Sequence, residues 1–335
     1  MARPALLPDN FTLCLVATVV VASVLPAAGD AAVVFKWLTT LAIALLFFLH
    51  GARLSRQAVV AGLLHWRLHL LVLASTFVLF PLLGLVLKPL LEPLVSPKFY
   101  LGVLYICVLP STVQSSIAMV ALARGNVSAA VCSASASTLL GIFVTPLLVG
   151  ALVAPHGGAS YGGLEAVGRI VLQLFVPFAL GHLLQPWIGG WVRARAKTLK
   201  LVDQSSIVLV VYTAFSAAVI EGLWHQVSGA QLASLLLVCA LLLATALATM
   251  TWASRRLGFG KEDEITIVFC GSKKSLASGV PMANVLFPAA AVGPIVLPVM
   301  LFHQMQLMVC AVLAQRYARR PDAPAVPTAA ATPAR

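Results

Sequence analysis

The sequence contains the stretch Phe269-Cys-Gly-Ser-Lys-Lys-Ser-Leu-Ala-Ser-Gly-Val-Pro281, in which two adjacent lysines, Lys273 and Lys274, interrupt an apolar segment. A charged side chain at the centre of a bilayer costs about 2.5–3.5 kcal/mol on insertion scales. The glycines and the proline of the same stretch are unfavourable inside an unbroken helix. Membrane proteins tolerate such a stretch where it lines a cavity or is buried in protein. We therefore predict a broken membrane helix here, with a binding site at the break.

The composition indicates a membrane protein. Of the 335 residues, 61% are hydrophobic and 10% are charged, and the mean hydropathy is +1.00, whereas a soluble domain carries about 25% charged residues. The net charge of +12 would suit a nucleic-acid partner, but most basic residues lie in short loops between apolar segments, as they do in membrane proteins. We therefore expect a polytopic helical protein in a lipid bilayer, without a nucleic-acid partner.

Ten apolar segments are long enough to cross a bilayer as helices of roughly 20 residues. The first follows Arg3 and ends near Pro26-Ala-Ala-Gly29, so it resembles a cleavable signal peptide. Cleavage would leave nine spans and would disturb the charge alternation and the repeat described below, so we keep this segment as a helix. The predicted spans are 11–29, 32–50, 69–88, 100–122, 127–152, 169–190, 203–223, 231–254, 265–288 and 291–315.

The basic residues predict the orientation of these spans. With the N-terminus in the cytoplasm, every lysine and arginine in a loop or tail falls on the cytoplasmic side, except Lys88 and Lys98. This asymmetry follows the positive-inside rule, and it predicts an inner-membrane protein with both termini in the cytoplasm. The Pro- and Ala-rich tail, residues 321–335, is expected to be disordered.

Two similar segments predict an internal repeat. Val113-Gln-Ser-Ser-Ile-Ala118 lies in the fourth span and Ser272-Lys-Lys-Ser-Leu-Ala277 in the ninth, so each occupies the fourth span of a five-span half. Since five is odd, the second half inserts upside down relative to the first, as in transporters with inverted repeats. The predicted fold is all-α, with repeats at residues 1–152 and 153–320 and with broken fourth and ninth helices.

Hydroxyl and amide side chains gather in the fourth and fifth spans. A proline and the polar residues after it predict an unwound centre in the fourth span, where freed carbonyls with Gln114, Ser115 and Ser116 would ligate a cation or a polar substrate group. Close packing of a Ser/Thr-rich helix explains the same residues. Ser133 and Ser137 share one face of the fifth span, where they either add oxygens to this site or let helices pack closely.

Lys273 and Lys274 lie deep inside the ninth span, far from either interface for a side chain that would snorkel to water. One ammonium, together with the partial positive charge of half-helix N-termini, would hold a carboxylate or sulfate. Alternatively, one ammonium takes the place of a bound metal ion. Ser272 and Ser275, which flank the lysines, complete this candidate site.

The remaining polar residues supply fewer candidates. His303, Gln304 and Gln306 lie near the middle of the tenth span, where a buried histidine relays protons or serves as a hydrogen-bonded structural residue. Asp203 and Glu221 fall at the ends of the seventh span, where we expect the membrane interface. The sequence contains no HExxH, CxxC, Walker A or GxGxxG motif, and its six cysteines lie in apolar segments as buried hydrophobes. We therefore expect neither an enzyme nor a cofactor.

Three motifs resemble those of the bile acid:sodium symporter family, most closely its SBF-like branch, to which the vertebrate seventh member of that carrier family also belongs. They are Pro110-Ser-Thr-Val-Gln-Ser-Ser116, Ala123-Arg-Gly-Asn126 and Phe269-Cys-Gly-Ser-Lys-Lys-Ser-Leu-Ala-Ser-Gly-Val-Pro-Met-Ala283. The resemblance covers nearly the whole chain. It implies ten helices in two inverted repeats, with a panel of spans 1, 2, 6 and 7 and a core of spans 3, 4, 5, 8, 9 and 10. The broken fourth and ninth helices would cross in that core.

The resemblance also implies sodium coupling, from which this sequence departs. The family holds sodium with a Ser-Asn pair in the fourth helix, hydroxyls in the fifth, and a Glu and a Gln in the ninth. At the matching positions this chain has Ser115-Ser116 for the pair, Ala130 and Ala134 for the hydroxyls, Phe269 for the Glu and Lys273 for the Gln. Sodium near Ser115 and Ser116 would be held weakly, because the site lacks the glutamate and has a lysine ammonium beside it.

We therefore expect a secondary transporter that moves an organic anion by alternating access. Its substrate would be a bile-acid-like molecule or another amphipathic carboxylate or sulfate. A lysine in place of the bound cation would make transport independent of Na⁺ or linked to H⁺. The alternative is a non-transporting membrane protein that regulates lipid or ion homeostasis through a partner, which the lack of a coupling acid would favour. A monomer is the default assembly.

Overall fold

The computed structural model describes residues 10–53, 65–153, 171–226 and 228–320. These residues form helices joined by short connections, and none of them lies in a β-strand, so the predicted all-α class is confirmed for this part of the chain. The tail predicted to be disordered, residues 321–335, lies outside the described residues.

The helices follow the predicted apolar segments along the chain. In the first half they are α1 (Asn10–Val24), α2 (Gly29–Arg53), α4 (Trp66–Ala74), the π-helical turn η2 (Ser75–Leu79), α5 (Phe80–Val86), α6 (Lys88–Leu91), α7 (Pro97–Val108), α8 (Gln114–Leu122), α9 (Val127–Leu148) and η3 (Val149–Val153). In the second half they are η4 (Val171–Phe175), α12 (Val176–Ala194), α13 (Ala196–Ile220), α14 (Leu223–Gln226), α15 (Gly229–Arg256), α16 (Lys261–Gly271), α17 (Leu276–Leu286) and α18 (Ala289–Ala318).

Each of the ten predicted spans coincides, within several residues, with one helix or with consecutive helices of the described chain. Six helical segments are long and apolar enough to cross a membrane, namely 29–53, 66–86, 127–153, 196–220, 229–256 and 291–318. The fourth and ninth predicted spans are each divided into two shorter helices, α7 with α8 and α16 with α17. The protein is therefore an integral membrane protein, while the count of ten spans in two inverted repeats stays a prediction.

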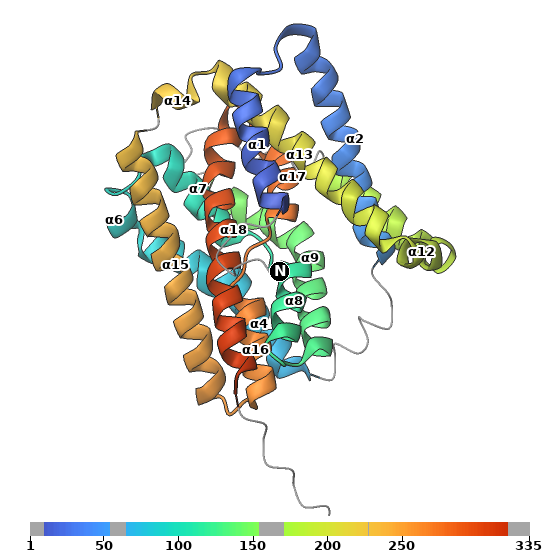
Figure 1. Cartoon of the computed structure of the whole chain (residues 1–335), viewed down its shortest axis with the longest axis vertical. Coiled ribbons are helices and arrows are strands. Elements are labelled where there is room, and N and C mark those ends of the chain that lie inside the picture. The colour runs from blue at the N-terminus through green and yellow to red at the C-terminus, as the bar shows by residue number, and fades with distance from the viewer. Residues whose placement is uncertain (1–9, 54–64, 154–170, 227, 321–335) are drawn as a thin grey trace, which may run out of the picture.

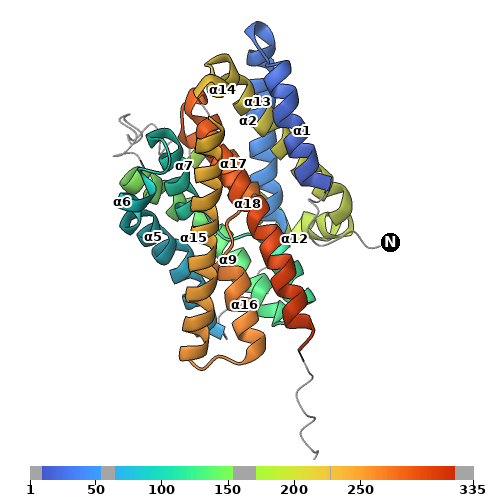
Figure 2. The same cartoon turned by 60° about the vertical axis from the view of Figure 1, so that its left-hand side comes forward.

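The described helices form two groups (Figures 1 and 2). In one group α12 packs along α2, and α13 packs against both α1 and α2. The other group contains α4 to α9 and α15 to α18, with α18 packed against α7, α15 and α17. Contacts of α13 with α17 and α18 join the two groups.

Two glycines allow α2 and α12 to approach closely. A Cβ added to Gly51 would lie 2.0 Å from the backbone oxygen of Phe178, and one added to Gly181 would lie 2.0 Å from the backbone oxygen of Phe48. Any side chain at either position would push the helices apart, since both obstacles are backbone atoms. Small residues at such contacts are typical of helix packing in membranes, where van der Waals contact drives association.

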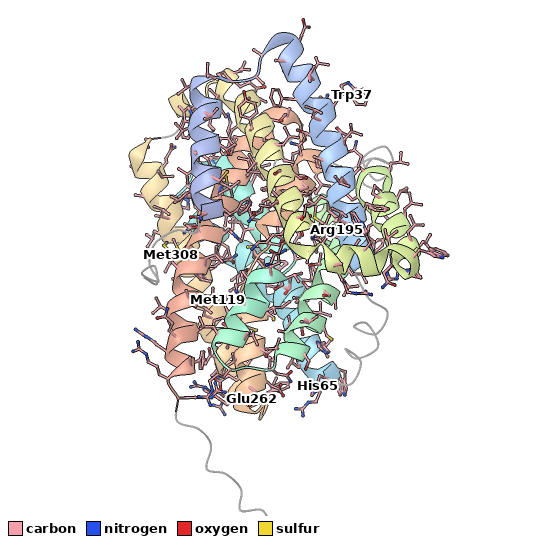
Figure 3. The ribbon with its side chains drawn as sticks, turned by 45° about the vertical axis from the view of Figure 1, so that its right-hand side comes forward. Trp37, His65, Met119, Arg195, Glu262 and Met308 are labelled. Atoms are coloured by element: carbon pink, nitrogen blue, oxygen red, sulfur yellow. The ribbon has the colours of Figure 1, made fainter. Side chains whose placement is uncertain are left out.

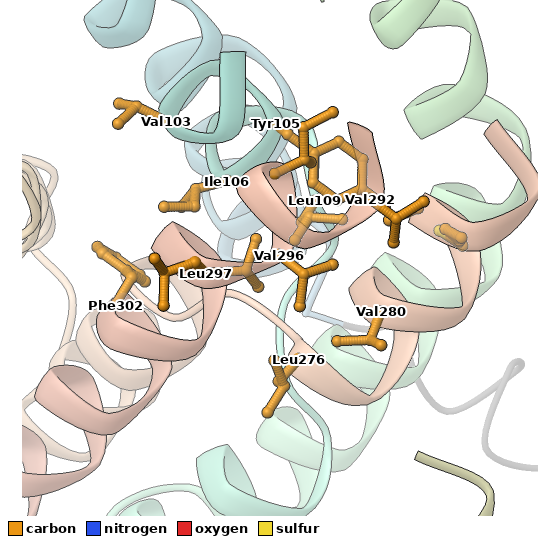
Figure 4. Close-up of a cluster of buried hydrophobic side chains, with 14 of the residues drawn as sticks. Val103, Tyr105, Ile106, Leu109, Leu276, Val280, Val292, Val296, Leu297 and Phe302 are labelled. Carbon is orange, nitrogen blue, oxygen red and sulfur yellow. The ribbon is translucent and has the colours of Figure 1, made fainter. Parts of the chain in front are cut away.

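The apolar core of the second group lies where α7, α17 and α18 meet. Val103 and Ile106 of α7, Val280 of α17 and Val296 of α18 are fully buried there (Figure 4). The hydroxyl of Tyr105 crosses this core and donates to the backbone oxygen of Gly279 at 2.7 Å. This core joins α7, which precedes one helix break, to α17, which follows the other.

Charged side chains gather at one end of the molecule. His65 and Glu262 lie at this end and Trp37 at the opposite end (Figure 3). Glu264 accepts hydrogen bonds from Lys261 at 2.7 Å and from Arg255 at 3.2 Å, and also from the hydroxyl of Tyr317 at 3.1 Å. This network joins the ends of α15 and α18 to the start of α16, which leads directly into the lysine-containing break.

Candidate functional site

The helix break predicted at the lysines lies between α16 and α17. Residues 272–275 are not helical, and the helix restarts after Ser275, whose side chain accepts a hydrogen bond from the amide of Ser278 as an N-cap. The amide of Ser275 donates to the backbone oxygen of Pro110 at 2.9 Å. This bond crosses directly to the break in the other half of the chain.

The second break lies between α7 and α8, at residues 109–113. Pro110 has no amide hydrogen to continue the helix. The next amide, that of Ser111, donates to the hydroxyl of Ser137 on α9 at 2.9 Å. Gly141 on α9 leaves room for this turn, since a Cβ there would lie 2.7 Å from the ring of Pro110. The predicted unwound centre of the fourth span is therefore present, and it contacts the break between α16 and α17.

The broken helices leave backbone oxygens without helical partners, and side chains supply the missing donors. Hydroxyl groups from three different segments satisfy the last turn of α16. Ser116 donates to Phe269 at 3.2 Å, Ser111 to Cys270 at 2.6 Å and Ser75 to Gly271 at 2.7 Å. The hydroxyl residues around the break at residues 109–113, together with Ser75 of η2, therefore close the end of α16, the helix that precedes the break at residues 272–275.

Lys274 closes the end of α7 in the same way. Its ammonium donates to the backbone oxygens of Thr76 at 2.8 Å, Cys107 at 3.0 Å and Leu109 at 2.8 Å. The side chain is 1% exposed, and its Nζ lies 4.1 Å from the centre of the Phe80 ring. An ammonium has three N–H donors, so these three bonds use all of them. Lys274 therefore fixes α7 and η2 to the break and has no donor left for a ligand.

Lys273 is also fully buried, but it makes fewer bonds. Its ammonium donates to the backbone oxygen of Ser115 at 2.8 Å and lies 5.7 Å from the centre of the Phe269 ring. Ser115 belongs to the first turn of α8, so Lys273 joins the break of one half to the restarted helix of the other. Adjacent side chains point in different directions, so the two lysines contact different helices.

The break is held from its other side by Gln306 of α18, which lies with His303 and Gln304 in the tenth predicted span. Its amide accepts from the backbone N–H of Lys274 and donates to the backbone oxygen of Lys274, both at 2.8 Å. Its Nε2 also lies 2.9 Å from Nδ1 of His303. Because an amide nitrogen donates, Nδ1 of His303 is the acceptor. A glutamine inside an apolar span was the available signal for this residue.

A cavity of about 550 Å³ lies between the two groups of helices. Gln114 and Ser115 from the first turn of α8 line it, as do Ser275 and Ser278 at the start of α17 and His303 of α18. Two helix N-termini therefore reach its wall, and each carries partial positive charge. Four of the predicted site residues come together here, namely Gln114, Ser115, Ser275 and His303.

The opposite wall of the cavity carries charged residues that the sequence did not single out as site residues. His50 and Arg53 of α2 and Lys200 and Asp203 of α13 line it. Asp203 is 6% exposed and forms an ion pair with Arg53. The side chain of Asp203 therefore turns inward to the guanidinium, while its expected place at a membrane interface stays a prediction. Each residue stands at an end of an apolar helix, and only the fold shows that they face one another.

The other predicted site residues lie beside the cavity rather than on its wall. The hydroxyl of Ser133 forms a hydrogen bond with Nδ1 of His69 at 2.6 Å. The hydroxyl of Ser272 donates to the backbone oxygen of Val268 at 2.6 Å. Gln304 has a buried side-chain oxygen without a hydrogen-bond partner. Ser116, Ser137, Lys273 and Lys274 make the helix-closing contacts described above. Binding roles for all these residues stay predictions.

A larger groove of about 1000 Å³ lies between α15 and α18, lined mainly by apolar side chains such as Leu247, Met308 and Leu313. It contains none of the residues of the two breaks. The smaller cavity is therefore the candidate functional site, because broken helices, helix N-termini and charged side chains converge on it.

Comparison with known proteins agrees with these features. A sequence profile of the SBF-like CPA transporter family matches residues 9–319. The chain is 65% identical over 322 residues to "Uncharacterized protein PA2026" of Pseudomonas aeruginosa, covering 96% of each chain. It is 58% identical over 314 residues to "Putative symporter YfeH" of Escherichia coli, covering 94% of each. It is 25% identical over 276 residues to "Sodium/bile acid cotransporter 7" of Rattus norvegicus, covering 82% of this chain and 81% of that protein.

Proposed function

The chain belongs to the SBF-like CPA transporter family, and we propose that it is a secondary carrier that moves an organic anion by alternating access. Membership of a family of membrane transporters points to a carrier rather than to an enzyme. It also disfavours the alternative of a regulator that transports nothing.

The observation that carries the proposal is the excess of positive charge around the cavity. The N-termini of α8 and α17 reach one wall, while Arg53 and Lys200 lie on the other. Helix N-termini and guanidinium groups both favour carboxylates and sulfates. Phe11, Phe178 and Leu276 also line the cavity, so an amphipathic anion with an apolar body fits these walls. Relatives bear the names of a symporter and of a sodium/bile acid cotransporter, which is consistent with such a substrate.

We propose that Lys273 supplies permanently the positive charge that a bound sodium ion supplies in sodium-coupled carriers. Its ammonium already donates to the backbone oxygen of Ser115. It therefore lies next to the sodium site that the resemblance implies near Ser115 and Ser116. Two cations at this distance would repel one another in a site without a carboxylate. Transport is then independent of sodium, and H⁺ is the remaining coupling ion.

The proposed movement separates two bodies. α1, α2, α12 and α13 would form the panel, and the group with the two breaks would form the core. The repeats would be residues 1–152 and 153–320, with the breaks of each half crossing in the core. The contact of Ser275 with Pro110 supports this crossing, since it joins the two breaks. The cavity between panel and core would open alternately to either side of the membrane.

We also propose an inner-membrane location with both termini in the cytoplasm, and a monomeric carrier. The support for the orientation is the cluster of Arg255, Lys261 and Arg320 with the start of α16 at one end of the described chain. Basic residues at one membrane face are retained on the cytoplasmic side. The monomer is the simplest assembly, since both walls of the cavity come from one chain.

Uptake into proteoliposomes tests the proposal. Labelled taurocholate, estrone 3-sulfate and succinate serve as probes, and at least one should enter faster than into protein-free liposomes, equally well with an inward sodium or potassium gradient. Lys273→Gln should reduce uptake or make it depend on sodium. Lys98→Gln, which removes a lysine from a predicted outside loop, should leave uptake unchanged. Entry of no probe would reject the carrier. Uptake by Lys273→Gln that is neither reduced nor made dependent on sodium would reject the role of the lysine.

A further inference from the structure

The ion pair between Arg53 and Asp203 is incomplete. Nη1 of Arg53, at the end of α2, donates to Oδ2 of Asp203 on α13. The other amino group of the guanidinium, Nη2, and the other carboxylate oxygen, Oδ1, are both buried without a hydrogen-bond partner. A buried polar atom without a partner is costly and uncommon. A guanidinium and a carboxylate can form two parallel hydrogen bonds, and this pair forms one of the two.

The pair lies on the wall of the cavity that we assign to the substrate. Asp203 is the carboxylate among the described residues that line this cavity. An organic anion in the cavity therefore meets a guanidinium that already holds a resident carboxylate. The substrate's anionic group and the carboxylate of Asp203 are chemically alike. An anion that binds the guanidinium through two parallel bonds uses both Nη1 and Nη2, so it competes with Asp203 for Nη1.

We propose that the anionic group of the substrate replaces Asp203 on Arg53, and that Asp203 then takes up a proton and so couples transport to H⁺. This inference rests on the proposed function and names the coupling group of that carrier. A carboxylate that loses its partner in a buried position is strongly destabilised in its charged form. The proton comes from the water of the compartment to which the cavity is open, and it binds to a carboxylate oxygen of Asp203. When the substrate leaves on the other side, Asp203 releases the proton there and pairs with Arg53 again.

The groups around Asp203 allow this exchange. From α2, His50 and Arg53 face the cavity, from α13 itself Lys200, and from α18 His303. Nδ1 of His50 donates to the backbone oxygen of Leu46 at 2.7 Å. The residues that α1, α8, α9, α12 and α17 contribute to the described wall do not titrate near neutral pH. Asp203 is thus the acid of a wall that is otherwise basic or neutral.

The exchange also determines the stoichiometry. One guanidinium accepts one anionic group, and one displaced carboxylate takes one proton. A monoanion and a proton therefore cross together without net charge. At equilibrium, an inward proton gradient of one pH unit should accumulate such an anion about tenfold, because each pH unit is a factor of ten in the equilibrium ratio.

Accumulation and exchange of labelled taurocholate, estrone 3-sulfate and succinate in proteoliposomes test this inference. Wild-type protein should accumulate the transported probe about tenfold per unit of inward pH gradient. Asp203→Asn keeps the shape of the side chain but cannot take up a proton in this range. It should therefore still exchange external for internal probe, while the pH gradient no longer produces accumulation. Arg53→Gln should lose both accumulation and exchange.

Two further variants separate coupling from folding. Arg53→Gln combined with Asp203→Asn removes both charges of the pair, so it should fold and still fail to exchange probe. Asp30→Asn removes an exposed carboxylate from the first turn of α2 and should accumulate probe as the wild type does. Accumulation by Asp203→Asn at the wild-type level would overturn the coupling role. Uptake by the wild type that ignores the pH gradient would also overturn it while leaving the carrier intact, whereas entry of no probe would reject the carrier itself.

Discussion

Replacing Lys274 with methionine removes one ammonium and leaves three buried backbone oxygens without this donor. These oxygens belong to Thr76, Cys107 and Leu109, at 2.8–3.0 Å from Nζ. A hydrogen bond to a charged group contributes about 1.5–3 kcal/mol. Removing the ammonium also removes the cost of burying its charge, and this offsets several kcal/mol of the sum of the three bonds. We therefore expect the free energy of unfolding to fall by about 3–5 kcal/mol, which is the value of three such bonds less this offset.

Lys273→Met provides the sharpest comparison, because it makes the same chemical change one residue away. Lys273 donates one hydrogen bond, to Ser115, which contributes about 1.5–3 kcal/mol. Removing this buried ammonium also removes its desolvation cost, so we expect a net loss below about 2 kcal/mol. Lys197→Met alters an exposed lysine of α13 and should stay within about 0.5 kcal/mol of the wild type.

Denaturant unfolding of the purified protein in detergent, followed by tryptophan fluorescence, measures these differences. The expected loss in unfolding free energy is largest for Lys274→Met, with Lys273→Met and Lys197→Met both well below it. A Lys274→Met protein as stable as the Lys197→Met control would refute the structural role that we assign to Lys274. A larger loss from Lys273→Met than from Lys274→Met would show that the number of hydrogen bonds does not govern the difference.

Two further predictions concern helix packing and pH. Gly51→Ala places a Cβ 2.0 Å from a backbone oxygen of α12, so the free energy of unfolding should fall by about 1–3 kcal/mol. In the same denaturation assay, Gly190→Ala should be neutral or stabilising, because its Cβ meets nothing within 4 Å. Burial raises the pKa of Glu264, but the hydrogen bonds and charges of Arg255 and Lys261 outweigh it and leave the pKa below its ordinary value. The resulting stabilisation is present above the ordinary pKa of about 4.3 and is lost as pH falls through the lower folded value. The denaturation midpoint of the wild type should therefore drop in acid, and Glu264→Gln should lose this part of the pH dependence; an identical acid drop in both would contradict the assignment.

The helix breaks could be predicted from the sequence because the membrane leaves few alternatives. Lysines, glycines and a proline inside an apolar segment are incompatible with an unbroken, lipid-facing helix. The same reasoning applied to Pro110 and the hydroxyl residues after it, and the chain is indeed interrupted at both places. The spans could be placed for a similar reason, since a run of about 20 apolar residues has one solution in a bilayer.

The roles of the two lysines could not be separated in the same way. Nothing in the sequence around Lys274 indicates that its partners are Thr76, almost two hundred residues away, and the last turn of α7. The charged wall of the cavity was missed for a related reason. Arg53 and Asp203 each end an apolar segment, where a charge usually marks the membrane interface, and they become partners only because α2 packs against α13.

The positions of the charges support our proposal that the broken-helix core works without a bound metal ion. Breaking a helix creates a C-terminal end with unsatisfied carbonyls and partial negative charge. At the end of α7 this charge is met by the ammonium of Lys274, and at the end of α16 the carbonyls are met by serine hydroxyls. Both ends are therefore satisfied by groups that are attached to the chain and cannot dissociate. An ion that never leaves cannot drive a transport cycle, so the driving ion of such a carrier has to bind elsewhere. Among the described residues that line the cavity, Asp203 is the carboxylate, so it is the group whose negative charge a proton can remove.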